Sequence, residues 1–379
     1  MNPHKRLKIL HLTTHLNIGG ITSYIDMTGS RLMQKGYGMG ILSSGGNMEE
    51  DLKKKGFDVF KFPIRTKSEL SPKLYWNLMA ISNLVKNEQI DLMHAHTRVT
   101  QVLAFFISKI TKVPFVTTAH GFYKPRLGRK LFGCWGRRVI AISPLVADEL
   151  QKTHRVDPKK IRLIQNAIDG EEFQKKYYEK NSSLERHQLG IPADALVVGS
   201  ISRLVQDKGH EYLVEAVQKL KSKFPNIFLI ILGNGREKEK LETLIQTSGL
   251  EDHARVIPAV KDVTGILSTM DIFVHPATYR EGFGFSIAEA MVVKKPVVAT
   301  NIWVINSIIQ DRINGFLVEP KSAAAIVKAV KFIVENPEQA KTIAENGQKM
   351  AFKLCSLDRM VDEIENVYEE VVDESRQSK

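Results

Sequence analysis

Short apolar segments alternate with longer amphipathic segments along almost the whole chain, and this alternation limits the fold more than any other feature. The short segments have the length and composition of buried strands. The segments between them repeat apolar residues at the spacing of a helix face. Such alternation predicts parallel sheets joined by helical crossovers. The chain has 379 residues, which is long enough for two such domains.

The strand pattern restarts once, near the middle of the chain. The expected strands of the first set are Lys8–Thr13, Gly40–Ser44, Phe57–Phe62, Leu92–His96, Phe115–His120, Val139–Ile142 and Ile161–Gln165. Those of the second set are Leu196–Ser202, Ile227–Leu232, Arg255–Ile257, Ile272–His275, Val297–Ala299 and Gly315–Val318, followed by helices at Ser322–Glu335, Pro337–Leu354 and Leu357–Val372. A polar, charged segment at 169–190 separates the sets and is interpreted as an interdomain link.

The expected fold class is therefore α/β, with two Rossmann-like, doubly wound parallel-sheet domains at 1–168 and 191–354. Domains of this type bind ligands beyond the carboxyl ends of their strands. We expect the two domains to face each other across a cleft, with the chemically useful residues at the strand ends.

One loop combines glycines with two carboxylates. Glu281 precedes Gly282-Phe283-Gly284-Phe285, and Glu289 lies in the expected helix that follows. A glycine loop at a helix N-terminus lets free backbone N–H groups approach an anion closely, and carboxylates accept hydrogen bonds from hydroxyl groups. The combination indicates a ligand with both phosphate and hydroxyls, such as a nucleotide sugar. The alternative is an ordinary turn with two solvated glutamates.

Other candidate residues also follow expected strands. Arg203 and Lys208 come after the first strand of the second domain, where an Arg fork and a Lys point charge suit a diphosphate. Gly19-Gly20 and Gly233-Asn234-Gly235 each sit between a strand and a helix, where backbone can approach phosphate. Solvated charges and simple tight turns are the alternatives.

Three histidines end strands of the first domain, namely His94, His96 and His120. His94 and His96 share one face of their strand, because side chains alternate along a strand. A metal site would need a third ligand that the sequence does not place, so structural or acceptor-side roles are favoured and no metal is expected.

Taken in order, these motifs resemble those of glycosyltransferase family 4, whose members are retaining GT-B enzymes. Glu281 and Glu289 with Gly-Phe-Gly between them resemble the E-x7-E signature, and Arg203 with Lys208 resembles the R-x4-K element. The resemblance implies that the two cations stabilise the leaving diphosphate. It also implies that the helix 357–372 packs back on the first domain.

The resemblance further implies a role for each remaining site residue. Glu281 and His120 would orient the donor sugar, and Glu289 would hold the ribose. The residues that would border the phosphates and the nucleotide are Gly19, Gly20, Gly233, Asn234, Gly235, Phe283, Gly284 and Phe285.

The expected reaction is transfer of a sugar from a UDP- or GDP-sugar to an acceptor hydroxyl with retained configuration, without an obligatory cofactor. A glycan or lipid-linked acceptor of cell-envelope synthesis is favoured. One departure keeps an inactive sugar-binding protein as an alternative, because Trp303–Ser307 replaces the family's Gly-Gly-x-Pro-Glu loop. A hydrolase or epimerase acting on the donor alone is a second alternative. A dehydrogenase is disfavoured, since no G-x-G-x-x-G follows either leading strand.

Charge is divided unevenly along the chain. Residues 1–168 hold 27 Lys and Arg against 11 Asp and Glu, whereas residues 169–379 hold 27 against 31. An excess of cations indicates an anionic partner, and nucleic-acid-binding motifs are absent from the sequence, so a membrane surface is favoured. The segment Phe122–Arg138 mixes basic and apolar residues in a way that suits a membrane interface or an anionic lipid-linked acceptor. An ordinary packed helix with solvated charges is the alternative.

The expected location is the cytoplasm, peripheral on the inner face of the membrane. No apolar run reaches the ~20 residues of a membrane-spanning helix. The two cysteines, Cys134 and Cys355, lie far apart in sequence and fit a reducing compartment.

Overall fold

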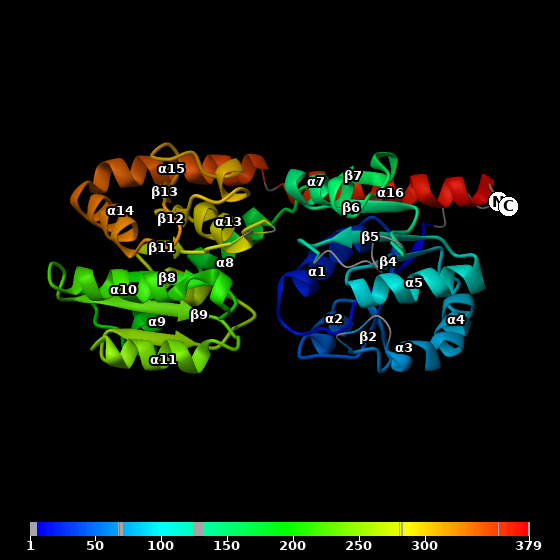
Figure 1. The fold of residues 1–379 in the computed structure, drawn as a ribbon, viewed down its shortest axis with the longest axis horizontal. Helices are drawn as coiled ribbons and strands as arrows, with labels where there is room; N and C mark the ends of the chain where they lie inside the picture. The colour runs from blue at the N-terminus through cyan, green and yellow to red at the C-terminus, as the bar shows by residue number, and fades with distance from the viewer. Residues whose placement is uncertain are drawn as a thin grey trace. The chain divides into compact units, whose positions relative to one another are not determined.

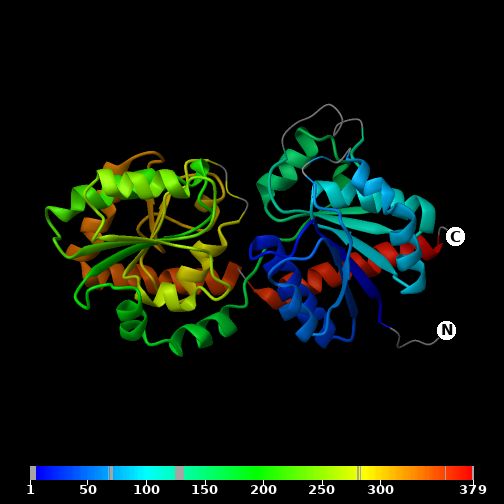
Figure 2. The ribbon, with the colours of Figure 1, turned by 90° about the horizontal axis from the view of Figure 1, so that it is seen from below.

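The computed structural model describes residues 6–66, 68, 71–123, 132–279, 281, 283–354 and 356–377. The chain forms two compact units, and each is described here by itself. The first unit combines Met1–Asn166 with Leu357–Lys379, and the second is Ala167–Ser356. Each unit holds one parallel sheet with helices on both of its faces (Figures 1 and 2).

The first unit has a seven-stranded sheet in the order β3-β2-β1-β4-β5-β6-β7. Its strands are β1 Lys8–Leu12, β2 Gly38–Ser43, β3 Asp58–Lys61, β4 Leu92–Ala95, β5 Phe115–Ala119, β6 Arg138–Ala141 and β7 Ile161–Leu163. Its helices are α1 Gly20–Gln34, α2 Glu49–Lys54, α3 Pro72–Trp76, α4 Leu78–Asn87, α5 Arg98–Thr111, α7 Pro144–Lys152, η1 Pro158–Lys160 and α16 Leu357–Gln377. The strand order reverses between β1 and β4, and such a point is where open α/β sheets bind ligands.

The second unit has a six-stranded sheet in the order β10-β9-β8-β11-β12-β13. Its strands are β8 Leu196–Ile201, β9 Ile227–Leu232, β10 Ala254–Ile257, β11 Ile272–His275, β12 Val297–Thr300 and β13 Phe316–Val318. Its helices are α8 Gly170–Tyr178, α9 Ser182–Gln188, η2 Gln206–Lys208, α10 His210–Lys221, α11 Lys238–Thr247, α12 Thr264–Thr269, α13 Phe285–Val292, η3 Ile305–Ser307, α14 Ala323–Glu335 and α15 Pro337–Leu354. Here the order reverses between β8 and β11.

The fold class expected from the sequence is confirmed, because both sheets are parallel and doubly wound. The reason is visible in the strands themselves. All six residues of β9 are buried, as a strand covered on both faces requires. No described helix has an apolar stretch of the length that crossing a bilayer requires.

The segment 169–190, interpreted from the sequence as a link, carries α8 and α9, and both belong to the second unit. The side chains of Asp169 and Asn181 cap these two helices by accepting backbone N–H bonds. Arg186 of α9 then donates to the Thr269 carbonyl and to Asp271 at 2.9 Å each. The polar residues of this segment are therefore helix caps and anchors.

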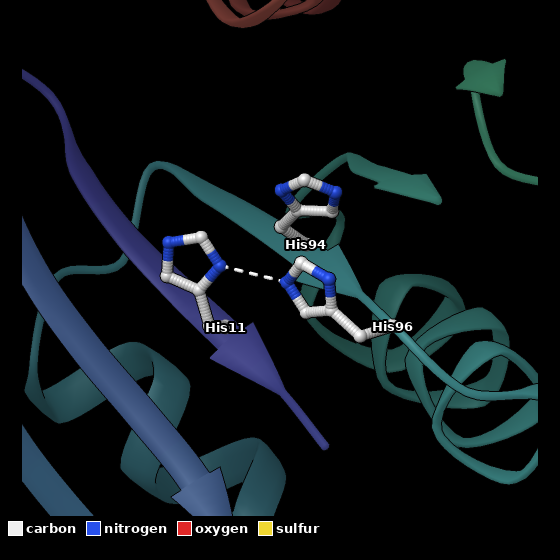
Figure 3. Close-up of side chains that lie close together, drawn as sticks. All are labelled: His11, His94 and His96. Carbon is white, nitrogen blue, oxygen red and sulfur yellow. Dashed lines mark hydrogen bonds between the residues drawn. The ribbon is translucent and has the colours of Figure 1, made fainter. Parts of the chain in front are cut away.

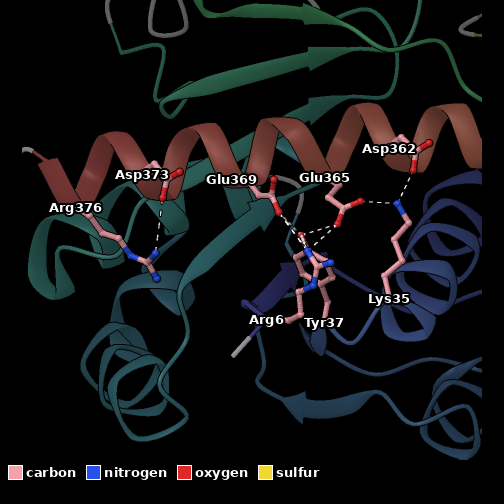
Figure 4. A network of polar contacts seen from close by, with 8 residues as sticks. All are labelled: Arg6, Lys35, Tyr37, Asp362, Glu365, Glu369, Asp373 and Arg376. Atoms are coloured by element: carbon pink, nitrogen blue, oxygen red, sulfur yellow. Dashed lines mark hydrogen bonds and ion pairs between the residues drawn. The ribbon is translucent and has the colours of Figure 1, made fainter. Parts of the chain in front are cut away.

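The acidic helix α16 packs on α1 and β5 of the first unit. Its apolar stripe, which includes Ile364 and Tyr368, is buried. On its acidic face Glu365 accepts from Tyr37 at 2.9 Å, and lies 2.5 Å from the Lys35 ammonium (Figure 4). Farther along, Glu370 lies 2.7 Å from Arg138. Part of the cationic excess of the N-terminal half is thus paired within the unit.

The charge division changes once α16 is counted with the first unit. The first unit then holds 30 Lys and Arg against 19 Asp and Glu, and the second holds 24 against 23. The net charges are +11 and +1, in place of +16 and −4 for residues 1–168 and 169–379. The first unit is still the basic one, but its excess is smaller than the sequence halves indicate.

Candidate functional site

In the second unit, the loop after β8 carries both predicted cations at the point where strand order reverses. Leu204 is fully buried and anchors the loop, while its neighbour Arg203 is exposed. The Ser202 hydroxyl lies 2.9 Å from His210 Nε2, which ties the start of the loop to α10. Within the described residues, the Arg203 guanidinium makes no ion pair. It is therefore available to an anion.

The glycine loop after β9 supports this cation loop. A Cβ at Gly233 would lie 1.9 Å from the Ser202 carbonyl oxygen, and one at Gly235 would lie 2.0 Å from that of Leu204. Leu204 N–H donates to the Asn234 carbonyl at 2.9 Å. Only glycine permits the two loops to approach so closely. The glycines predicted to border the nucleotide thus also position the backbone on either side of Arg203.

Lys208 and Glu281, both predicted catalytic residues, meet as an ion pair in which each side chain is 12% exposed. His275, the last residue of β11, adds a third member, because its Nε2 lies 3.0 Å from Glu281 Oε1. A carboxylate only accepts hydrogen bonds, so His275 donates from Nε2. Sequence analysis missed His275. The signal that could have identified His275 is its position, because it is a polar residue that ends a buried strand six positions before Glu281.

Burial sets the protonation of this group. Burial, with the charge of Arg203 as a smaller cause, lowers the pKa of Lys208 to about 8, although Asp207 acts in the opposite direction. Burial also holds the pKa of His275 well below its ordinary range, with smaller contributions from Lys208 and His210. His275 is therefore a neutral donor that orients Glu281.

A tight turn holds the β8 and β11 loops together. Gly209 has a φ of 63°, and a Cβ there would lie 2.2 Å from the Pro276 carbonyl oxygen. Thr278 N–H donates to the Asp207 carbonyl at 2.9 Å. This contact explains how Lys208, which follows β8, reaches Glu281, which follows β11.

Helix α13 begins directly after this group. Gly284 takes a φ of 88° at its N-cap, a conformation that favours glycine. No side chain of a described residue caps the helix there. The rings of Phe283 and Phe285 meet edge-on, with centroids 5.0 Å apart. The first turn therefore offers N–H groups and the positive end of the helix dipole to an anion. Arg280 and Gly282 lie outside the described residues.

Glu289 lies one turn inside α13 and is partly buried. Burial raises its pKa to about 7, with the charge of Asp262 as a smaller cause. No described residue forms a hydrogen bond or ion pair with its carboxyl group. A carboxyl group held without a partner is suited to hydroxyl donors supplied by a ligand.

In the first unit, α1 joins the predicted glycine loop to the predicted histidine. Gly19 and Gly20 are exposed at the start of α1. Tyr24, one turn along, packs edge-on against the ring of His120 with centroids 4.8 Å apart. A Cβ on Gly19 would meet nothing within 4 Å, so packing does not require glycine there. Burial lowers the pKa of His120 to about 3.

Behind His120 lies a cluster of buried histidines. His11 of β1 and His94 of β4 occupy paired positions in the sheet, and His96 follows His94 (Figure 3). One ring nitrogen from each of these three residues lies within 4.8 Å of the other two, a spacing at which they could hold a metal ion. The sequence analysis put His94 and His96 on one face of a strand but did not identify His11, because β1 is far from β4 in the sequence.

Models of two glycosyltransferase families match successive stretches of the chain. The model described as Glycosyltransferase Family 4 matches residues 18–172. The model described as Glycosyl transferases group 1 matches residues 181–350, which include Arg203, Lys208, Glu281 and Glu289. Together the two matches span most of both structural units.

Curated relatives and solved structures agree with these matches. The chain is 24% identical over 373 residues to an uncharacterised glycosyltransferase of Methanocaldococcus jannaschii, covering 93% of this chain and 94% of the relative. It is 25% identical over 311 residues to the UDP-Gal:alpha-D-GlcNAc-diphosphoundecaprenol alpha-1,3-galactosyltransferase of Escherichia coli, covering 78% and 79%. The Anabaena protein HepE, solved with UDP and glucose, superposes with a TM-score of 0.83 at 22% identity, over 96% of this chain and 100% of that chain.

Proposed function

Because the chain is a family 4 glycosyltransferase with the GT-B fold, we propose that it transfers a hexose from a nucleotide diphosphate sugar to an acceptor hydroxyl and retains the anomeric configuration. One observation carries the proposal. Lys208, Glu281 and His275 form a single connected group where the order of the second sheet reverses, close to Arg203, which makes no ion pair with any described residue. Retention is inferred from the family signature in Glu281 and Glu289.

In the proposed reaction the bond between the anomeric carbon and the diphosphate oxygen breaks, and a bond to the acceptor oxygen forms. The acceptor proton passes to the departing diphosphate. Arg203, Lys208 and the first N–H groups of α13 stabilise the negative charge that grows there. Glu281, held by His275, orients the sugar, and Glu289 accepts bonds from the ribose. The glycine loop at Gly19-Gly20 and the His120 ring are assigned to the donor phosphates and sugar.

The donor is proposed to be a UDP-sugar and the acceptor a lipid-linked or glycan hydroxyl in polysaccharide or glycolipid synthesis. HepE was solved with UDP and glucose, and the Escherichia coli relative is named for a UDP-galactose donor and a diphosphoundecaprenol-linked acceptor. A GDP-sugar is the alternative donor.

A two-stage assay tests this function. Thermal shift with UDP, GDP and their sugars identifies the donor, since a ligand stabilises the folded state by RT ln(1 + [L]/Kd). Donor consumption is then followed with and without lipid-linked and free glycan acceptors. Acceptor-dependent consumption is the expected result. Consumption without acceptor would indicate a hydrolase or epimerase, and binding without consumption would indicate an inactive protein.

The pKa of Glu289 predicts how donor affinity depends on pH. The carboxylate, not the carboxylic acid, accepts two ribose hydroxyls, and its pKa is raised to about 7. Donor Kd should therefore increase as pH falls below about 7, approaching tenfold per pH unit. Calorimetric titration between pH 5.5 and 8, about the range in which this group titrates, measures the effect.

The Glu289→Gln variant should bind the donor weakly and with little pH dependence in this range. Glu251→Gln removes an exposed carboxylate of the same unit and is the matched control. A Glu289→Gln variant that retained the pH dependence of the wild type would place the titrating group elsewhere.

The proposed location is the cytoplasmic face of a membrane, with the first unit in contact with anionic lipid. That unit carries a surface of linked aromatic side chains from α3, α5 and the segment before β6. Tyr75 contacts Phe106, and Phe105 contacts both Phe106 and Phe132, through rings 5.5 to 6.4 Å apart. Trp76 at the end of α3 is 79% exposed, and Met79 on the next helix, α4, is 62% exposed. We call this set the aromatic surface.

Cations accompany the aromatic surface. Lys109 Nζ lies 5.5 Å above the Phe105 ring, and Lys112 is exposed at the end of the same helix. Apolar and cationic groups on one face suit the boundary of an anionic bilayer. Of the segment Phe122–Arg138, which the sequence favoured for this role, residues 124–131 lie outside the described residues.

Replacing both Trp76 and Met79 with serine should weaken binding to vesicles that contain anionic lipid by about tenfold or more, because burying one large apolar side chain contributes ~1.5–3 kcal/mol. Sedimentation of the full chain with such vesicles measures it, and added salt should weaken binding further. Trp303→Ser is the matched control, since Trp303 is 77% exposed in the second unit. Equal losses in the two variants would contradict docking through the aromatic surface.

A further inference from the structure

A row of hydrogen-bonded imidazoles connects the interior of the first unit to His120. His11 Nδ1 lies 2.8 Å from His96 Nε2, and His96 Nδ1 lies 2.9 Å from His120 Nε2. His11 and His96 are buried, whereas His120 is partly exposed. We call these three residues the histidine row. Its inner end is His11 Nε2, and its outer end is His120 Nδ1.

The row admits two arrangements of protons, because each neutral imidazole carries one N–H. In the outward arrangement His11 donates from Nδ1 to His96, His96 donates from Nδ1 to His120, and His120 carries its proton on Nδ1. In the inward arrangement both bonds reverse. His11 then carries its proton on Nε2, and His120 Nδ1 becomes an acceptor.

The inner end decides between the two arrangements. His11 Nε2 is buried and has no hydrogen-bond partner among the described residues. The inward arrangement would bury an N–H donor there without an acceptor. The outward arrangement leaves only a bare ring nitrogen. Unpaired buried N–H groups are rarer in folded proteins than under-satisfied acceptors, so the outward arrangement is favoured.

A metal ion is a less satisfactory occupant of this cluster. The ring centroids of His94 and His96 lie only 4.1 Å apart, so each ring restricts the room that the other has to turn towards a shared ion. Both nitrogens of His94 are already engaged, with Tyr368 OH at 2.6 Å and Thr118 Oγ1 at 2.7 Å. The hydrogen bond between His11 and His96 would also have to break.

We propose that the histidine row holds His120 as a neutral imidazole with its proton on Nδ1, so that His120 donates a hydrogen bond to an oxygen of the bound substrate and does not accept its proton. His96 is the positioning residue, because its Nδ1–H fixes both the tautomer and the ring of His120. The assignment of the ligand rests on the proposed function, whereas the assignment of the tautomer does not.

The same geometry opposes charging His120. An imidazolium must donate from Nε2, which would reverse the row and bury an unpaired N–H at His11. Among the described residues, the other polar side chains that contact the cluster are Tyr24 from α1, His94 from β4, Thr118 from β5 and Tyr368 from α16, and none of these supplies a negative charge at neutral pH. Burial acts in the same direction, since it lowers the pKa of His120 to about 3.

Nitrogen NMR of the full chain, labelled with ¹⁵N histidine, tests the proposal directly. His120→Ala assigns the His120 signals. In the wild type, His120 should show the Nδ1–H tautomer at about pH 7 and should not titrate between about pH 5 and 8. His96→Leu should lose this tautomer and lower turnover by about tenfold or more. In His96→Asn, the side-chain amide can place an N–H near the position of the His96 Nδ1. This variant should therefore restore both the Nδ1–H tautomer of His120 and turnover.

Several outcomes would overturn the proposal. They are an Nε2–H tautomer of His120 in the wild type, titration of His120 in the range above, or equal defects in His96→Leu and His96→Asn. If adding one equivalent of Zn²⁺ shifted the nitrogen NMR signals of His11, His94 and His96 together, the cluster would be a metal site instead. If neither variant folds, the wild-type spectrum still decides. If the protein transfers sugar but His120 carries its proton on Nε2, only this proposal is contradicted. If His120 carries its proton on Nδ1 but no sugar is transferred, only the proposed function is contradicted.

Discussion

Arg203→Ala should lower kcat by about 10²–10³-fold, the usual loss when one preorganised group is removed from a developing negative charge. The diphosphate gains negative charge as the glycosidic bond breaks, so a cation beside it acts more strongly on the transition state than on the bound donor. Donor Kd should therefore change less than kcat. Arg203 is exposed and makes no ion pair among the described residues, so the melting temperature should be unchanged.

Lys208→Ala should lower kcat by a similar factor, but it also removes the partner of a buried carboxylate. The melting temperature of this variant should fall, which separates the two cations experimentally. Lys328→Ala is the matched control for charge, since Lys328 is exposed on α14 of the same unit. The measurement is kcat and donor Kd for the three variants. Near-normal kcat in Arg203→Ala and Lys208→Ala would refute the mechanism proposed here.

The sequence was sufficient for the strands and for the cations of the site because those signals are local. Buried parallel strands are short and continuously apolar, and the residues that follow them must lie at one edge of a sheet. Arg203, Lys208 and Glu281 could be placed in this way. The roles of Gly233 and Gly235 in holding the Arg203 loop could not, because they depend on how closely two loops approach.

Contacts between neighbouring strands of the sheet could not be predicted from the sequence for a related reason. His11 pairs with His94 only because β1 lies beside β4, which is a matter of strand order and register. Nothing in the spacing of residues along the chain states that order. The resemblance implied that α16 packs on the first domain, but the spacing of residues did not show that its glutamates meet Lys35 and Arg138. The charge of α16 was therefore counted with the wrong domain.

The segment 169–190 shows a different kind of error. Its charged composition and missing strand indicated a link, yet Asp169 and Asn181 are good helix caps. Capping residues before stretches of helix-forming residues predict helices even where the apolar content is low. In this segment composition was given more weight than the local capping signal.

The other substitution with a large expected effect, Glu281→Gln, should lower the stability of the protein. Glu281→Gln keeps the shape of the side chain but leaves the Lys208 ammonium buried without its counter-charge. Breaking a buried ion pair from one side typically costs about 3–5 kcal/mol. His275 cannot compensate, because the nitrogen that faces residue 281 donates a hydrogen bond. The free energy of unfolding should therefore decrease by about that amount.

A second substitution and a pH series test whether the buried charge of Lys208 causes the loss of stability in Glu281→Gln. Glu281→Gln combined with Lys208→Met should recover most of the lost stability, because no charge is then buried, while activity stays low. In the wild type the pKa of Lys208 is about 8, and loss of the Glu281 carboxylate should lower this pKa further, because an opposite charge is removed. The folded variant therefore releases the Lys208 proton at a lower pH than the folded wild type does. Its stability deficit relative to the wild type should shrink as pH rises towards about 8 and stay constant above that. Thermal and denaturant unfolding of the single and double variants, relative to the wild type at each pH, measures both effects. A deficit that persisted in the double variant would mean that residue 281 stabilises the loop by its packing, and that the ion pair with Lys208 is not what holds the site together.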